Sequence, residues 1–360
     1  MEQQTEFSAR RERLLASMKQ AQAGAFVVSA LPNVRYLSGF TGSNASLLVT
    51  GTRTLLFTDP RYEIQASLES DCEVKIAKGP LTKELLKWAR RLRFKSLAFE
   101  QNRISFEDFQ QLREGAQGIR LKPLSRIVET LRTIKSSAEI AAIRHSVQLN
   151  SAALEQSLRH FRSSMTERDL AADIGYRMRR LGADREAFET IVASGERSAL
   201  PHAHPTSYRI QPNQLLLIDM GATVAGYASD MTRTHAVGKP SAHTRRMYRA
   251  VLESQLAAID SARPGVSCSS VDRAARDVLR SHRLDSLFIH STGHGLGLEI
   301  HEAPRLGRKE KTKLEPGMTI TIEPGVYAEG VGGIRIEDTV VVTSTGCEVL
   351  TPTEKELVVL

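Results

Sequence analysis

Two stretches of this sequence share one form, an apolar run that ends in an acidic residue: Leu215-Leu216-Leu217-Ile218-Asp219 and Met318-Thr319-Ile320-Thr321-Ile322-Glu323. A second acid follows each run across a predicted hairpin, Asp230 after the first run and Glu337 after the second. Two predicted helices precede each run. Two halves of the same form indicate an internal duplication with pseudo-twofold symmetry and one shared central site.

The residues before this duplication form a different pattern. Short apolar strands at 25–28, 45–49, 54–58 and 96–99 alternate with helical segments such as 81–93 and 106–115, which predicts an α/β domain. This part contains no histidine, so we expect it to contribute shape, assembly or one wall of a site. Ser136 and Glu139 form a capping box that starts a new helix. The chain is therefore predicted to be α/β (α+β), with domains at 1–130 and 131–360.

Composition excludes several classes of protein. The chain has 360 residues, of which 41% are hydrophobic and 25% charged, as in ordinary soluble domains. It shows neither a signal-peptide h-region nor an apolar run of about 18 residues, so no membrane association is expected. Its three cysteines are far apart, which fits a cytoplasmic protein without a disulfide framework or thiolate zinc site. The net charge of +8 comes from clusters at helical spacing, interpreted as solvated helix faces, so no nucleic-acid partner is expected.

The four acids need compensating positive charge. Each is embedded among residues that are expected to be buried, and a buried carboxylate costs several kcal/mol unless it is paired or bound to metal. Any one of them alone is explained by a helix cap or a salt bridge. Four at matched positions would need four cations, and only Arg233 and Arg335 lie close by in sequence.

Residues 288–302 add histidines to this set: Phe288-Ile289-His290-Ser291-Thr292-Gly293-His294-Gly295-Leu296-Gly297-Leu298-Glu299-Ile300-His301-Glu302. Taken alone, the stretch fits a glycine-rich surface loop as well as a metal or acid–base site. The HExxH pattern fails, because Arg305 stands where its second histidine would be. Four carboxylates with His294 favour two hard or borderline cations, such as Mn, Co, Zn or Fe, over a single zinc. Two of the carboxylates must then bridge the ions.

Several motifs in this region occur together and in a fixed order. The sequence resembles the metallopeptidase family that includes methionine aminopeptidase, Xaa-Pro aminopeptidase and prolidase and that has the pita-bread fold. The resemblance covers about residues 135–360, and residues 33–40 resemble the creatinase-type N-terminal domain of the proline-specific branch. The matching motifs are Leu217-Ile218-Asp219-Met220-Gly221, Ser229-Asp230-Met231-Thr232-Arg233-Thr234, His290-Ser291-Thr292-Gly293-His294-Gly295, Ile300-His301-Glu302, Ile322-Glu323-Pro324-Gly325 and Gly333-Ile334-Arg335-Ile336-Glu337-Asp338.

The resemblance implies a role for each metal-binding position. Asp219 would chelate one metal, Asp230 and Glu337 would bridge both, and His294 and Glu323 would hold the second. Manganese is the expected ion, with Co, Zn or Fe as alternatives.

The resemblance also implies roles for residues around the metals. Glu323 would carry a proton for the attacking hydroxide, and His301 would stabilise the tetrahedral intermediate or the leaving group. His202 would contact the substrate near the scissile bond, although spacing alone does not separate it from His204. Two further residues, Arg335 and Tyr327, would orient the bridging carboxylates, while His290 would have a supporting place near the site.

The implied activity is that of an Xaa-Pro aminopeptidase, a metallo-exopeptidase that cleaves between an N-terminal residue and a following proline by means of a metal-bridging hydroxide. Its substrates would be short peptides with proline at the second position. The alternative in the same class is an Xaa-Pro dipeptidase (prolidase). An alternative from another class is a non-enzymatic member of the fold that binds peptides or nucleic acid. The creatinase-type domain further implies a homodimer.

Overall fold

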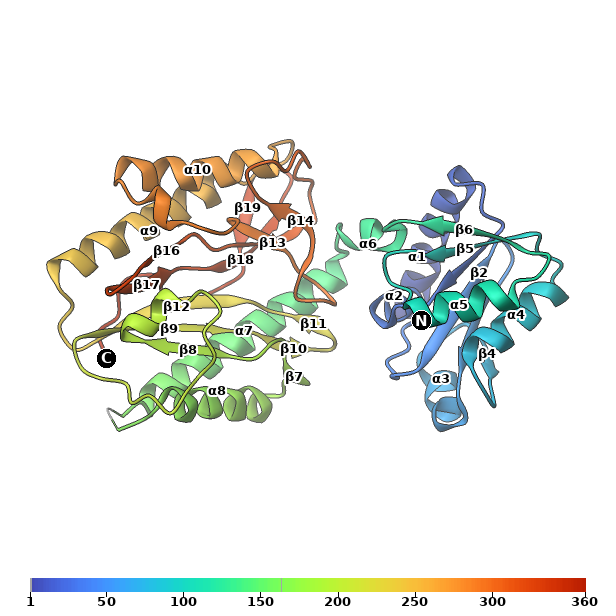
Figure 1. The fold of residues 1–360 in the computed structure, drawn as a ribbon, viewed down its shortest axis with the longest axis horizontal. Coiled ribbons are helices and arrows are strands. Elements are labelled where there is room, and N and C mark those ends of the chain that lie inside the picture. Colours follow the sequence, from blue (N-terminus) through green and yellow to red (C-terminus); the bar gives the residue numbers. More distant parts are fainter. Residues whose placement is uncertain (1, 163) are drawn as a thin grey trace. The chain divides into compact units, whose positions relative to one another are not determined.

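The computed structural model describes residues 2–162 and 164–360. The chain divides into two units, one ending at Arg132 and the other beginning at Thr133. Each unit has its own sheets and its own hydrophobic core (Figure 1). No helix in these two ranges is long and apolar enough to span a membrane.

The first unit is an α/β domain built on one six-stranded sheet with the order β4-β3-β2-β1-β5-β6. Only β2 runs against the other strands. Helices α4 and α5 pack on one face, where Leu85, Ala89 and Leu112 meet Leu48 and Leu97. The strands are β1 (Ala25–Val28), β2 (Ala45–Thr50), β3 (Thr54–Thr58), β4 (Glu73–Ile76), β5 (Ser96–Glu100) and β6 (Arg120–Leu124); the helices are α1 (Glu2–Gln20), α2 (Leu31–Ser38), α3 (Glu63–Glu69), α4 (Leu81–Arg91), α5 (Phe106–Gly115) and α6 (Ile127–Arg132).

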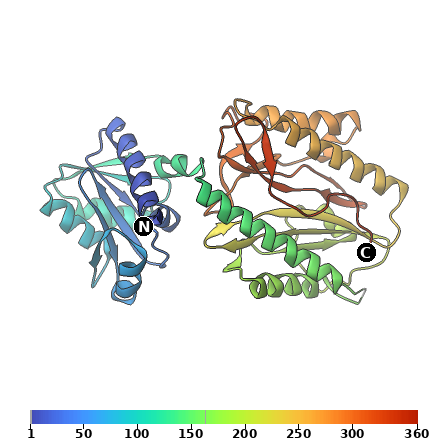
Figure 2. The ribbon, with the colours of Figure 1, turned by 180° about the vertical axis from the view of Figure 1, so that it is seen from behind.

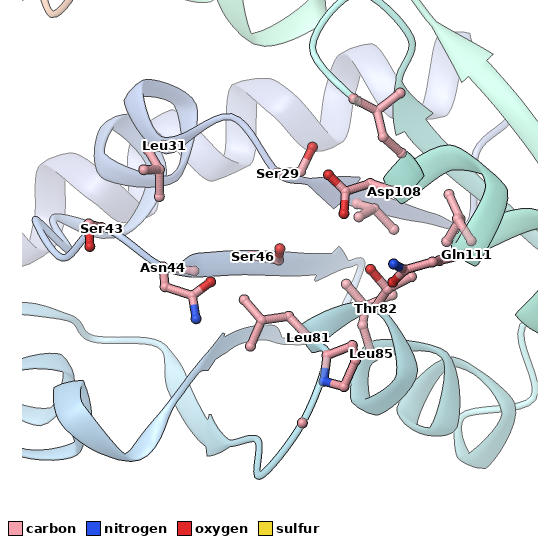
Figure 3. A pocket seen from close by; sticks show the side chains of 16 residues that line it. Ser29, Leu31, Ser43, Asn44, Ser46, Leu81, Thr82, Leu85, Asp108 and Gln111 are labelled. Carbon is pink, nitrogen blue, oxygen red and sulfur yellow. The ribbon is translucent and has the colours of Figure 1, made fainter. Parts of the chain in front are cut away.

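A cavity of about 580 Å³ opens beside the ends of β1 and β2 in this domain (Figure 3). Ser46 on β2, Ser29 directly after β1 and Asn44 directly before β2 line it, together with leucines on α4. Asp108 is the one ionisable residue among those that line it. The cavity therefore offers neither a metal-binding set nor an acid–base pair.

Sequence patterns missed α2 and β6. The backbone N–H groups directly before α2, those of Ser29 and Ala30, donate hydrogen bonds to the buried carboxylate of Glu100, a residue distant in sequence. The basic cluster Arg10-Arg11-Glu12-Arg13 was among those interpreted as solvated helix faces, and this was wrong for Arg10. This side chain is buried, donates to the Tyr36 carbonyl and lies 4.3 Å from the Tyr36 ring centroid.

The second unit repeats one arrangement twice. Helices α7 and α8 cover the sheet with the order β12-β9-β8, and α9 and α10 cover the sheet with the order β14-β13-β15-β18-β19 (Figures 1 and 2). The elements of the first half are α7 (Ser137–Arg159), α8 (Glu167–Leu181), β7 (Arg185–Glu186), β8 (Ile191–Ser194), β9 (Gln214–Met220), β10 (Ala222–Val224), β11 (Tyr227–Ala228) and β12 (Met231–Val237). Those of the second half are α9 (Ala242–Ser261), α10 (Cys268–Ser281), β13 (Gly293–Gly295), β14 (Glu302–Leu306), β15 (Thr319–Ile322), β16 (Gly325–Ala328), β17 (Gly332–Arg335), β18 (Asp338–Val342) and β19 (Cys347–Val349).

The local signals explain where the helices begin. Ser136 and Thr166 each form a complete capping box, and Gly182 ends α8 in the left-handed conformation at φ 108°. Each helix pair then buries an apolar face on its sheet. The predicted α/β class with an internal duplication is confirmed.

The second acid of each half differs slightly from its predicted place. Both were expected within return strands, but Asp230 directly precedes β12 and Glu337 directly precedes β18. The strand ladder is interrupted there because the chain passes from a small hairpin into the main sheet. Both acids therefore stand at equivalent strand starts, which is the geometry that a duplicated site requires.

Candidate metal centre

The two halves bring their acids together at one buried position. Strand β9 pairs antiparallel with β12, and β15 pairs antiparallel with β18. Hydrogen bonds then join the halves: Thr232 donates through its hydroxyl to Glu337 at 2.6 Å, and the Thr339 hydroxyl donates to the Asp230 carbonyl at 2.9 Å. Asp219, in β9, and Glu323, just after β15, lie beside them.

His294 faces these acids from β13. Its Nε2 atom lies 3.5 Å from Asp230 Oδ2 and 3.6 Å from Glu323 Oε1. Candidate ligand atoms of Asp230, His294 and Glu337 all lie within 4.8 Å of one another. The Nδ1 atom is 2.9 Å from the Gly295 carbonyl, so Nδ1 carries the hydrogen and Nε2 offers its lone pair to the site.

The acids repel one another in the absence of a cation. Burial, followed by the charges of neighbouring acids, raises the pKa of both Asp230 and Glu337 well above the usual range. Asp219 receives a hydrogen bond from Arg335 at 2.7 Å on Oδ2, whereas its buried Oδ1 has no hydrogen-bond partner in the described chain. This surplus of oxygen donors, together with one imidazole, fits divalent cations of the hard or borderline kind.

A chain of hydrogen bonds runs from Asp219 through Arg335 and Tyr327 to His290. Arg335 donates to Asp219, to the Thr232 hydroxyl and, at 2.6 Å, to the Tyr327 hydroxyl. Tyr327 lies 2.9 Å from His290 Nε2, and His290 Nδ1 lies 2.8 Å from the Ser291 carbonyl. Because burial raises the pKa of Tyr327 to about 12, the phenol keeps its hydrogen and donates it to His290. His290 thus has both ring nitrogens engaged outside the acid cluster.

The remaining histidines differ in their surroundings. The ring of His301 lies 4.4 Å from that of His294, centroid to centroid. Burial and the neighbouring His294 lower the pKa of His301. His202 is exposed and close enough to act electrostatically on both His290 and His301. His204 instead pairs with the exposed Glu189 at 3.0 Å. His202, rather than His204, is therefore the one that influences the two neighbouring histidines His290 and His301.

Sequence reasoning missed one cross-strand neighbour of His294. Arg305 is the cross-strand partner of His294 in the β13–β14 pair, and directly opposed side chains of an antiparallel pair lie on the same face. It is also exposed. The strand register that makes them neighbours is not visible in the spacing of the two residues.

The glycines of the histidine stretch have a structural reason. At Gly293, a Cβ atom would lie 2.0 Å from the Thr321 carbonyl oxygen. Glycine is required there for close approach to β15, the strand that ends beside Glu323.

Comparison with known proteins defines the class. Residues 141–344 match Metallopeptidase family M24, and residues 10–134 match the Creatinase/Prolidase N-terminal domain. A curated relative, the Xaa-Pro dipeptidase of Pyrococcus horikoshii, is 35% identical over 96% of this chain and 98% of its own length. The chain belongs to metallopeptidase family M24, in its proline-specific branch, and is a metal-dependent peptide hydrolase.

Two solved structures cover nearly the whole chain. The Xaa-Pro dipeptidase from Bacillus anthracis has a TM-score of 0.96 and 37% identity, covering 98% of this chain and 100% of its own. The X-Pro aminopeptidase from Thermotoga maritima has a TM-score of 0.90 and 36% identity, covering 94% of this chain and 98% of its own.

Proposed function

We propose that this protein is an Xaa-Pro dipeptidase that uses two divalent metal ions. The observation that carries the proposal is the duplicated cluster of four acids and His294, in a chain that matches named Xaa-Pro dipeptidases along almost its full length. These relatives favour the dipeptidase over the aminopeptidase that was our first interpretation. The Thermotoga maritima structure keeps the aminopeptidase as the second candidate.

The proposed ligand set follows the two halves. Asp219 would hold one ion, His294 and Glu323 would hold the other, and Asp230 and Glu337 would serve both. Manganese is the expected metal. When bound, the pair of ions supplies Lewis acidity and a water of lowered pKa as nucleophile.

The protein's own groups do the remaining work. Glu323 takes the proton of the attacking water and returns it to the leaving nitrogen of proline. His301 and His202 donate hydrogen bonds to the oxygen on which charge develops. Arg335 holds Asp219 in place, and Tyr327 in turn fixes the orientation of Arg335.

Arg305 provides a basis for selecting dipeptides. A dipeptide carries its C-terminal carboxylate one residue from the scissile bond. Arg305 is the cross-strand partner of His294, and a guanidinium group is suited to bind that carboxylate. A tripeptide has an amide at the same position, which Arg305 binds more weakly.

Paired substrates test the assignment. With added Mn, hydrolysis of Gly-Pro is expected to exceed that of Gly-Pro-Ala. Arg305→Met is expected to raise KM for Gly-Pro by roughly 10-fold or more, because the variant loses the binding free energy of one charge-assisted hydrogen bond. The nearby exposed Arg308→Met serves as the control and is expected to behave as the wild type. Faster cleavage of Gly-Pro-Ala would overturn the dipeptidase in favour of the aminopeptidase, and no cleavage of either peptide would overturn both.

We extend the proposal to a cytoplasmic homodimer, as the resemblance to the proline-specific branch implies. Light scattering of the intact chain is expected to give twice the mass of one chain, and the mass of a single chain would contradict the dimer.

A further inference from the structure

A buried ion pair joins two parts of the catalytic domain outside the acid cluster. Lys135 Nζ lies 3.2 Å from Glu302 Oε2, and the two side chains are only 1% and 7% exposed. Neither residue belongs to the proposed metal ligands. Glu302 directly follows His301, and Lys135 lies three residues after the end of the first unit.

The loop before His301 is folded around the carboxylate of Glu302. The backbone N–H of Glu299 donates to Glu302 Oε1 at 3.1 Å, and the N–H of Gly297 donates to the Glu299 carbonyl at 3.0 Å. A Cβ atom at position 297 would lie 2.8 and 2.9 Å from the two Glu302 carboxylate oxygens. A side chain at 297 would therefore displace the Glu302 carboxylate.

This loop is anchored next to the acid cluster at its other end. The Gly297 carbonyl accepts a hydrogen bond of 2.8 Å from the N–H of Ala228, two residues before Asp230. The loop also carries His301, whose ring packs 4.4 Å from that of His294. A displacement of the loop therefore moves His301 relative to the metal ligands.

Lys135 is held rigidly from the opposite side. Its backbone N–H donates to the Gly317 carbonyl at 2.9 Å, and Ile134 forms a β-bridge with Met318, directly before β15. Strand β15 ends beside Glu323. The Lys135 ammonium thus ties the His301 loop to the strand that leads to a proposed metal ligand.

We infer that Lys135 and Glu302 are positioning residues that hold the loop 297–301, and with it His301, in the orientation needed for peptide hydrolysis. A buried ion pair is a poor way to gain stability, because desolvation of both charges offsets their attraction. It does impose one arrangement, since the ammonium hydrogens and the carboxylate oxygens must meet. A loop that carries a substrate-contacting histidine requires such a unique arrangement. The inference rests on the proposed function for its kinetic test but not for its structural test.

The kinetic test is a double-mutant cycle with His301. Lys135→Met is expected to lower kcat for Gly-Pro by about 10- to 100-fold, as for other residues that orient active-site groups, with a smaller change in KM. In a His301→Ala background the same substitution is expected to have almost no further effect, because the residue through which Lys135 acts is already absent. Lys135→Arg keeps the charge and is expected to restore most of the activity.

A structural test needs no activity. Hydrogen exchange of the metal-free protein is expected to show faster exchange of the Gly297 and Glu299 amides in Lys135→Met than in wild type. Arg177→Met, which breaks the Arg177–Asp173 pair on α8, is the matched control and is expected to leave these amides and kcat unchanged. If Lys135→Met fails to fold, Glu302→Gln enters the same cycle, because its amide oxygen still accepts from Glu299.

Two outcomes overturn the inference. One is an equal loss of kcat from Lys135→Met with and without His301, which would mean a general structural effect. The other is unchanged exchange at Gly297 and Glu299. A wild-type protein that cleaves no Xaa-Pro dipeptide would refute the proposed function, while the exchange experiment would still decide the role of Lys135.

Discussion

Glu337 and Asp338 are neighbours in sequence and both are buried, but their carboxylates lie in opposite electrostatic environments. Asp338 accepts from Arg233 at 2.8 Å and from Gln255 at 2.8 Å, and lies 2.5 Å from Lys355 Nζ. Glu337 accepts from the Thr232 hydroxyl, and its pKa is raised by burial and then by the charges of Asp230, Glu323 and Asp219.

The difference separates structural acids from functional acids. On the Asp338 side the protein supplies its own cations, so the charges are compensated within the chain. On the Glu337 side the compensation must come from outside, and divalent metal is the group whose chemistry fits. Burial alone, which the two residues share, does not make this distinction.

The largest effect is expected from Glu337→Gln. The amide keeps the size of the side chain but removes the carboxylate that we propose as a ligand of both ions, so turnover of Gly-Pro with Mn is expected to fall roughly 10³-fold or more, because the metals supply several kcal/mol of transition-state stabilisation. Steady-state kinetics with the folded variant measures this. Turnover near the wild-type rate would remove Glu337 from the metal set.

Asp338→Asn tests the other side of the comparison. It leaves the buried Arg233 without its carboxylate partner, so the free energy of unfolding is expected to fall by about 3 kcal/mol, with or without Mn. Denaturant titration measures the change. An Asp338→Asn protein as stable as the wild type would show that this cluster is not held by charge compensation.

A pH-dependent stability is expected on the Asp338 side, where His235 lies on β12 two residues after Arg233. Both ring nitrogens of His235 are buried without a hydrogen-bond partner in the described residues. Burial, and secondarily Arg233, lowers the pKa of His235 from 6.5 to about 4. Between pH 4 and pH 6.5 the imidazole takes up a proton in the unfolded chain but not in the folded one. The free energy of unfolding therefore keeps the full contribution of His235 above pH 6.5 and falls by about 3 kcal/mol as the pH drops toward 4.

Unfolding measured across pH 4 to 7 tests this contribution. His235→Phe removes the titrating group and is expected to show a smaller loss of stability over this range than the wild type. The exposed His243→Gln is the control and is expected to follow the wild type. Identical pH profiles for wild type and His235→Phe would contradict the contribution of His235.

The smallest expected effect is a gain. In metal-free protein, Glu337→Gln removes one of several mutually repelling buried charges, so the free energy of unfolding is expected to rise by about 1 kcal/mol. Added Mn at about 100 times its Kd is expected to stabilise the wild type by about 2.7 kcal/mol and this variant by less. A Glu337→Gln variant less stable than metal-free wild type would mean that the acids are compensated within the chain.

Much of the catalytic domain was predictable because its signals are local. Capping boxes at Ser136 and Thr166 and the apolar runs ending at Asp219 and Glu323 specify elements without reference to distant residues. The spacing of His202 and His204 in the sequence could not separate their roles. The two residues differ because His204 pairs with Glu189, and this surface contact leaves no pattern in the sequence. Spacing also could not show Arg305 opposite His294, or Lys135 beside Glu302, since these neighbours depend on strand register and on contacts between distant segments.

Anomalous diffraction at the manganese edge, from crystals grown with Mn²⁺, tests whether the four acids and His294 bind two divalent ions. Two peaks are expected among Asp219, Asp230, His294, Glu323 and Glu337, about 3.5–4 Å apart as in other two-metal sites. Data of the same quality without a peak at this position would contradict this metal binding.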